Sequence, residues 1–180
     1  MNRRAQFHTL ALPHLRSVHR LARQMAGPDR AEDLTQETFL KAWTHFKKFD
    51  PATNCRAWLY RILHNTWISE WRKTRLELPV ADVDEVPAEP SYDWEQERLG
   101  SLLSTDVQWA LDQLPDAYRF AVLLADVEEL TYQEIAHAME CPIGTVMSRI
   151  NRGRRMLRRL LDERREMQTA PPLRIVARER

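Results

Sequence analysis

Apolar residues recur every three or four positions along the first 75 residues, which predicts helices rather than strands. The first helix is expected over residues 7–25 and should end at Gly27-Pro28. Asp29 is placed to cap a second helix, with Glu32 three residues later in a capping-box arrangement. The second helix should bury a stripe on one face, formed by Leu34, Thr38, Ala42 and Phe46.

A third helix is predicted after the break at Asp50-Pro51, capped by Asn54 and continuing to about Arg75. Three helices joined by short turns form a small bundle. Residues 77–100 then lose the helical period and contain three prolines and many acidic residues, which indicates an extended or loosely ordered acidic linker. Helical spacing returns from about Leu102.

A helix-turn-helix is predicted in the last third of the chain. Pro115 suits the first turn of a preceding helix, and residues 131–134 read Thr-Tyr-Gln-Glu, a second capping box. The short helix that follows should turn at Glu140-Cys141, and Pro142 should open a long helix that ends near Glu166. The residues expected to pack the two helices together are Ile135, Ala136, Met139, Ile143, Val146 and Ile150.

Composition adds that the 180 residues can form one domain or two small ones, with 43% apolar residues for a core and only four glycines. Cys55 and Cys141 cannot form a disulfide framework. No segment approaches the roughly 20 apolar residues of a membrane span, and the N-terminus lacks a secretory signal. We therefore expect a cytoplasmic protein without membrane insertion.

No catalytic pattern is present in the sequence: it has no Gly-rich phosphate loop, no HExxH and no nucleophile elbow. The six histidines are scattered and none pairs with a cysteine at zinc-finger spacing. We expect no enzyme activity, no catalytic residue, no metal and no cofactor.

Charge is strongly segregated along the chain. Residues 1–76 carry a net charge of +8, residues 77–130 carry −12, and residues 131–180 carry +5. Two basic blocks on either side of an acidic one suggest two sites for a polyanion, although two solvated basic surfaces would give the same pattern.

The long helix of the helix-turn-helix should present polar and basic side chains outward, where they can bind base edges or phosphates. These are Thr145, Ser148, Arg149, Asn151 and Arg152. Later turns carry Arg154, Arg155, Arg158 and Arg159, which suit the DNA backbone. The alternative for these arginines is that they only complement the helix dipole.

Two further surfaces stand out in the first bundle. Residues 56–75 interleave aromatic and basic residues around Asn65, as suits single-stranded nucleic acid, although the tryptophans could instead be core and the cations a solvated face. Of these, Trp58 is expected in the core. Residues 31–43 place four side chains on one helix face that could dock a basic helix or simply be solvated. They are Asp33, Gln36, Glu37 and Leu40.

The sequence resembles the extracytoplasmic-function (ECF) sigma factors of the sigma-70 family. The resemblance rests on AEDLTQETFLKAW, RAWLYRILHNTWISEWRK, Leu114-Pro115 and LTYQEIAHAMECPIGTVMSRINRGRRML, which with their spacing cover residues 5–165. Within the family the sequence looks most similar to members that respond to thiol-oxidative stress. The resemblance to the ECF family implies an all-α protein with two helical domains, region 2 over 5–76 and region 4 over 101–166. The acidic linker over 77–100 would join them, and a flexible tail would follow over 167–180.

The resemblance also implies partners and sites: core RNA polymerase through its β′ clamp helices and β flap, promoter DNA, and an anti-sigma factor. Asp33, Gln36, Glu37 and Leu40 would contact polymerase. Asn65 would hold an extruded base of the −10 element, with Arg61, His64 and Arg72 as neighbours. The −35 duplex would be read by Thr145, Met147, Ser148, Arg149, Asn151, Arg152, Arg154 and Arg155.

Two departures from the family pattern bear on specificity. Many members carry Arg at the position of Met147, so the −35 preference is expected to differ, and many carry Asp at the position of Ser69. A stand-alone helix-turn-helix regulator would explain residues 131–159 but leaves the other two surfaces unused. A nucleic-acid-processing enzyme would need a metal or nucleophile cluster that the sequence lacks.

Overall fold

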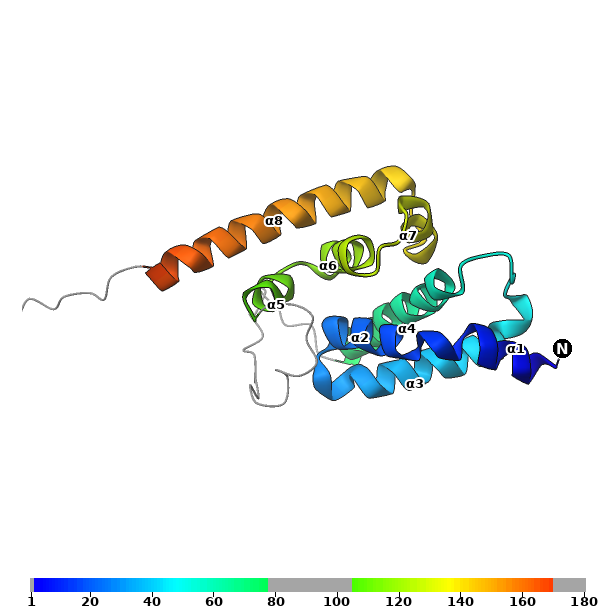
Figure 1. The fold of residues 1–180 in the computed structure, drawn as a ribbon. Helices are drawn as coiled ribbons and strands as arrows, with labels where there is room; N and C mark the ends of the chain where they lie inside the picture. Colours follow the sequence, from blue (N-terminus) through cyan, green and yellow to red (C-terminus); the bar gives the residue numbers. More distant parts are fainter. Residues whose placement is uncertain (1, 78–104, 170–180) are drawn as a thin grey trace, which may run out of the picture.

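The computed structural model describes residues 2–77 and 105–169, and these form two groups of helices that pack against each other (Figure 1). The first group consists of α1 (Arg3–Leu10), η1 (Leu12–His14), α2 (Leu15–Ala26), α3 (Pro28–His45), η2 (Phe46–Lys48) and α4 (Cys55–Glu77). The second consists of α5 (Thr105–Asp112), α6 (Asp116–Val122), η4 (Leu123–Val127), α7 (Tyr132–Ala138) and α8 (Ile143–Thr169). The all-α fold in two helical units is therefore confirmed, while nearly all of the predicted linker and most of the predicted tail lie outside the described residues.

The start of the chain differs from the sequence prediction. The single helix expected over 7–25 is two helices, α1 and α2, separated by the 3₁₀ turn η1. Pro13 lies in this turn, and because proline has no N–H it cannot continue the α-helical ladder.

The predicted Asp29 cap is also wrong. The residue that caps α3 is Gly27, whose φ of 78° lies in a region that glycine adopts without a steric penalty. Pro28 takes the first helical position, where its missing N–H costs nothing. Asp29 lies in the first turn, where its negative charge still favours the helix N-terminus.

The core of the first group follows the predicted pattern. The stripe at Leu34, Thr38, Ala42 and Phe46 is buried, and Trp58 packs in the core against Phe46 and Phe49. The Asn54 cap is confirmed, because its side-chain oxygen accepts from the N–H groups of Arg56 at 3.0 Å and Ala57 at 3.3 Å.

The second group holds the helix-turn-helix, α7 and α8. The capping box is confirmed: the N–H of Glu134 donates to the Thr131 hydroxyl, and the Glu134 carboxylate accepts from the N–H of Thr131 at 2.8 Å. Pro115 precedes α6 as its cap rather than lying in its first turn. The predicted packing of Ile143 between the helices is wrong: its side chain is 41% exposed because it lies at the start of α8, beyond the contact with α7.

A π-helical turn, η4, leads from α6 towards α7. Its wide turn is marked by the Glu128 N–H, which donates to the Leu123 carbonyl five residues earlier at 3.0 Å. Glu129 then adopts the left-handed conformation with φ of 53°. This irregular segment points Glu128 towards the first group of helices, where its side chain is buried.

Candidate nucleic-acid and polymerase interfaces

The long helix α8 carries the predicted DNA-reading residues on its outer side. Met147, Asn151, Arg152 and Arg155 are exposed, whereas Thr145, Ser148 and Arg149 are half-buried. Arg152 is therefore a better placed candidate than Arg149, whose guanidinium lies 3.6 Å from the Cys141 sulfur in the turn. Arg154 is paired with Asp126 of η4, so part of its charge is already engaged within the second group.

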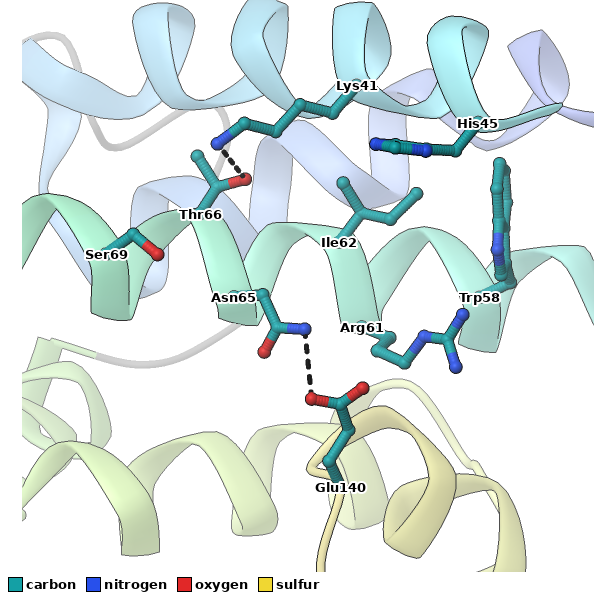
Figure 2. Close-up of a pocket in the computed structure, with 9 residues that line it drawn as sticks. All are labelled: Lys41, His45, Trp58, Arg61, Ile62, Asn65, Thr66, Ser69 and Glu140. Atoms are coloured by element: carbon teal, nitrogen blue, oxygen red, sulfur yellow. Dashed lines mark hydrogen bonds between the residues drawn. The ribbon is translucent and has the colours of Figure 1, made fainter. Parts of the chain in front are cut away.

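A cavity of about 390 Å³ lies beside Asn65, between α3, α4 and the turn that follows α7 (Figure 2). It falls in the size range of small-ligand pockets. It combines cations, an aromatic ring and neutral hydrogen-bonding groups, which are the features that an unstacked base needs. The lining residues are Lys41, His45, Trp58, Arg61, Ile62, Asn65, Thr66, Ser69 and Glu140.

Glu140 is the lining residue that comes from the second group of helices. The Asn65 side-chain amide donates to its carboxylate at 3.2 Å (Figure 2). Arg61, one helical turn before Asn65, lies 3.3 Å from the ring of His137 on α7. The predicted single-strand surface is thus in contact with the helix-turn-helix.

The acidic face on α3 borders this cavity through Lys41, which lines the cavity and pairs with Glu37. Asp33 and Gln36 are exposed, and Leu40 is 67% exposed although it is apolar. Glu37 is paired with Lys41 at 2.7 Å. All four predicted side chains reach the surface, while Leu34 and Thr38 of the same helix are buried.

Comparison with known proteins decides the family. Residues 10–77 match Sigma-70 region 2, and residues 105–157 match Sigma-70, region 4. The ECF RNA polymerase sigma factor EcfG of Rhodopseudomonas palustris is 36% identical over 84% of this chain and 81% of its own. The chain belongs to the ECF sigma factors of the sigma-70 family.

Other relatives of this sigma factor differ in length and identity. The ECF sigma factor SigE of Mycolicibacterium smegmatis is 41% identical over 83% of this chain, but the chain spans only 59% of SigE. The structure of RpoE of Bartonella quintana with the anti-sigma factor NepR has a TM-score of 0.70 and 32% identity, covering 87% of this chain and 97% of that one. CnrH in complex with the cytosolic domain of CnrY gives a TM-score of 0.63 and 28% identity, with 90% of each chain covered. The placement among thiol-stress members stays a prediction.

The four residues predicted for −10 recognition by this sigma factor are not all brought together. Asn65 and Arg61 line the cavity. His64 is buried on another side of α4, where its ring stacks on Phe120 with centroids 4.6 Å apart. Burial lowers the pKa of His64, so the ring is neutral at pH 7. The side chain of Arg72 lies outside the described part of the structure.

Several residues of the cavity were missed by sequence reasoning. Lys41 and His45 lie on α3, and Ser69 was noted only as a departure from the family pattern. Helical spacing could have placed Ser69 near Asn65, since residues four apart share a face. Nothing local in the sequence connects Lys41 or Glu140 to Asn65, because they belong to other parts of the chain.

Further observations concern a cysteine, the residue types that bind metals, and the character of the helices. Burial raises the pKa of the Cys55 thiol to about 11, so it is protonated at neutral pH. Within 2–77 and 105–169, His, Cys, Asp and Glu form no group of three that could hold a metal. None of the described helices combines the length and apolar character of a membrane span.

Proposed function

We propose that three separate surfaces of this sigma factor carry promoter-directed transcription initiation. The exposed face of α3 that ends at Leu40 binds the β′ clamp helices of core RNA polymerase. The cavity beside Asn65 captures an unpaired base of the −10 element. The outer side of α8 around Arg152 reads the −35 duplex.

The observation that carries the proposal is the cavity beside Asn65. An amide offers both a donor and an acceptor, so it can distinguish one base from the others. Arg61 and Lys41 supply positive charge for the backbone of a single strand. Capture of an extruded base offsets the energy of unpairing, which is how a protein without a catalytic centre can favour an opened promoter.

Two asparagines on different helices provide a matched test. Asn65→Ala should lose base preference at one −10 position, and this loss should shrink on a template that is already unpaired there. Asn151→Ala on α8 should alter preference only in the −35 element. Run-off transcription with core polymerase on single-base promoter variants measures both. A uniform loss at every position for Asn65→Ala would contradict the capture of a base.

Further parts of the proposal follow from the family. We infer that region 4 also contacts the β flap, that an anti-sigma factor binds the chain, and that the protein works in the cytoplasm without enzyme activity of its own. An anti-sigma partner is supported by RpoE of Bartonella quintana, which is 32% identical to this chain and crystallised in complex with the anti-sigma factor NepR. We also retain the domain limits 5–76 and 101–166 as proposals.

A further inference from the structure

The contact between the two groups of helices is centred on a buried carboxylate. Glu128 is only 1% exposed, although its side chain is an ionisable carboxylate. Arg20 of α2 donates to Oε1 of Glu128 at 2.6 Å, and the hydroxyl of Tyr60 on α4 donates to Oε2. Arg56 donates to the backbone carbonyl of Glu128 at 2.8 Å and lies 3.9 Å from its carboxylate.

These partners all belong to region 2, whereas Glu128 belongs to region 4. If the two regions separate, the Glu128 carboxylate is hydrated by water and no longer requires the partners from region 2. If they stay together, a neutral side chain at position 128 would leave Arg20 and Tyr60 without the charge they surround. Removing one partner of a buried pair is far more damaging than the net strength of the pair suggests. The charge at Glu128 therefore favours the closed arrangement specifically.

Two other carboxylates of region 4 engage amides of region 2 along the same contact. Asn54, which caps α4, donates to Glu134 of the α7 capping box at 2.5 Å, so the caps of two helices are linked. Asn65 donates to Glu140 at 3.2 Å at the edge of the cavity. Of these two carboxylates, Glu140 lies where region 2 is proposed to meet nucleic acid.

The backbone at Glu140 supports a role for its side chain. Its φ is 49°, in the left-handed region that glycine adopts at lower energy than other residues. The turn therefore carries a less favourable residue, and its carboxylate reaches Asn65. Glycine at this position would relax the turn and lose that contact.

We propose that the free chain holds itself closed, with Glu128 as the latch and Glu140 over the cavity beside Asn65, so that the −10 strand is excluded until the two regions part. The exclusion rests on the proposed function of that cavity; the latch does not. Core polymerase or an opened promoter would have to separate the regions before a base could enter. The carboxylates of region 4 then act as an internal substitute for the nucleic acid.

The distance between the regions tests the latch without reference to DNA. Dyes attached through unnatural amino acids at positions 47 and 158, both exposed, report the separation by energy transfer in the full chain. Glu128→Gln should lengthen the mean distance. Glu129→Gln, the same change at the adjacent exposed residue, should leave it unchanged.

A second variant removes the latch from the other side. Tyr60→Phe keeps the ring and deletes only the hydroxyl that donates to Glu128, so it cannot unfold region 4. It should lengthen the distance as well, by less than Glu128→Gln. If neither variant lengthens the distance while both keep the circular dichroism of the parent chain, the latch is overturned.

Binding of a short random-sequence single-stranded DNA tests the exclusion. If about one molecule in ten is open, Glu128→Gln should bind the strand up to about tenfold more tightly, since apparent affinity scales with the competent fraction. Glu140→Gly should also bind more tightly without loss of thermal stability. Opening without tighter binding overturns the exclusion. The assignment of the cavity itself is tested by run-off transcription with Asn65→Ala in the holoenzyme. There, under the proposal, polymerase has already separated the two regions.

Discussion

The two helices proposed to read DNA are presented differently in the same molecule. On α8 of region 4, Asn151 and Arg152 face outward and are exposed. On α4 of region 2, Arg61 and Asn65 contact His137 and Glu140 of the other region. Asn65 is itself exposed, so the two surfaces differ in what their polar groups contact rather than in exposure alone.

The difference follows from what each helix must recognise. A duplex presents its phosphates and groove edges at all times, so a helix such as α8 can bind it without first being uncovered. A surface that binds unpaired bases would also bind any exposed single strand or RNA, because stacking and phosphate contacts tolerate most sequences. Under the proposed closure, the Glu140 carboxylate would engage that surface and give selectivity before the promoter is reached.

The largest expected effect concerns a third surface, the proposed polymerase face of α3. We expect this face to bind polymerase whether or not regions 2 and 4 are in contact. Glu37→Lys reverses a charge on the proposed polymerase face of α3 and should abolish binding to core polymerase, because like charges across an interface cost several kcal/mol. The lost pair with Lys41 is exposed and worth roughly 0.5 kcal/mol, so the fold should survive. Co-purification with core measures the effect. Glu129→Lys, the same charge reversal at an exposed residue of region 4, is the control.

Binding to core by Glu37→Lys at the level of the parent chain would show that α3 is not the docking face. The energy transfer between the regions should be unchanged in this variant, since α3 takes no part in the latch. A change in that distance would mean that the two surfaces are coupled.

The next effect concerns region 4, and it tests whether −35 binding by α8 depends on the packing of α8 against α6. Gly153 of α8 lies so close to α6 that an added Cβ would be 2.6 Å from a methyl group of Val122 and 3.3 Å from the carbonyl of Tyr118. Gly153→Ala should therefore destabilise region 4 by about 1–3 kcal/mol and weaken −35 binding. Gly144→Ala, also on α8 but with open space around it, should be neutral. Thermal unfolding and duplex binding of both variants provide the measurement, and equal stability of the two would refute the close contact.

A smaller effect separates reading from packing on α8 itself. Arg152→Ala removes an exposed guanidinium and should weaken −35 binding by about 1–2 kcal/mol, with relaxed preference at one position if the contact is to a base. Arg154→Ala instead breaks the pair with Asp126 and should weaken binding without base preference. Competition with −35 variants distinguishes the two. If Arg154→Ala lost base preference, Arg154 rather than Arg152 would be the residue that reads a base.

Local features of the fold could be predicted from the sequence because their causes are local. The Asn54 cap and the capping box at Thr131 and Glu134 depend on residues two or three positions apart. The break at Pro13 also has a local cause, since proline lacks the N–H that a helix needs, but the apolar spacing on either side suggests one continuous helix.

The contacts of region 2 with region 4 could not be predicted, because they join distant residues. Arg20 and Glu128 are 108 positions apart, and Asn65 and Glu140 are 75 apart. In the sequence Glu128 belongs to an acidic stretch that suggests solvation, and only a tertiary contact reveals that it is buried. The family resemblance groups His64 with Asn65, but adjacent residues on a helix point about 100° apart, and only Asn65 of the two lines the cavity.

The smallest expected effect is a dependence of closure on pH, and His64 is its main source. Burial lowers the pKa of His64 in the closed chain; the hydrogen bond with Asn65 opposes this, nearby Arg149 adds to it, and Glu140 and Asp116 oppose it. In the open chain the pKa of the His64 ring would return to its ordinary value near 6.5. Above that value both forms are neutral and His64 has no effect. As pH falls below it, the open form takes up the proton first, so closure weakens.

Energy transfer between positions 47 and 158 should therefore decrease as pH falls from about 6.5 to about 5.5, within the range over which histidine titrates. His64→Gln should flatten this response, and an unchanged response in that variant would assign the effect to other groups. Glu134 acts in the same direction at lower pH. Its burial alone would raise its pKa, but hydrogen bonds from Asn54 and Thr131 and the charge of Arg56 hold the pKa below its ordinary value, and of these only Asn54 and Arg56 belong to region 2 and depend on closure. Its stabilisation of the closed form is consequently lost only below the range in which His64 responds.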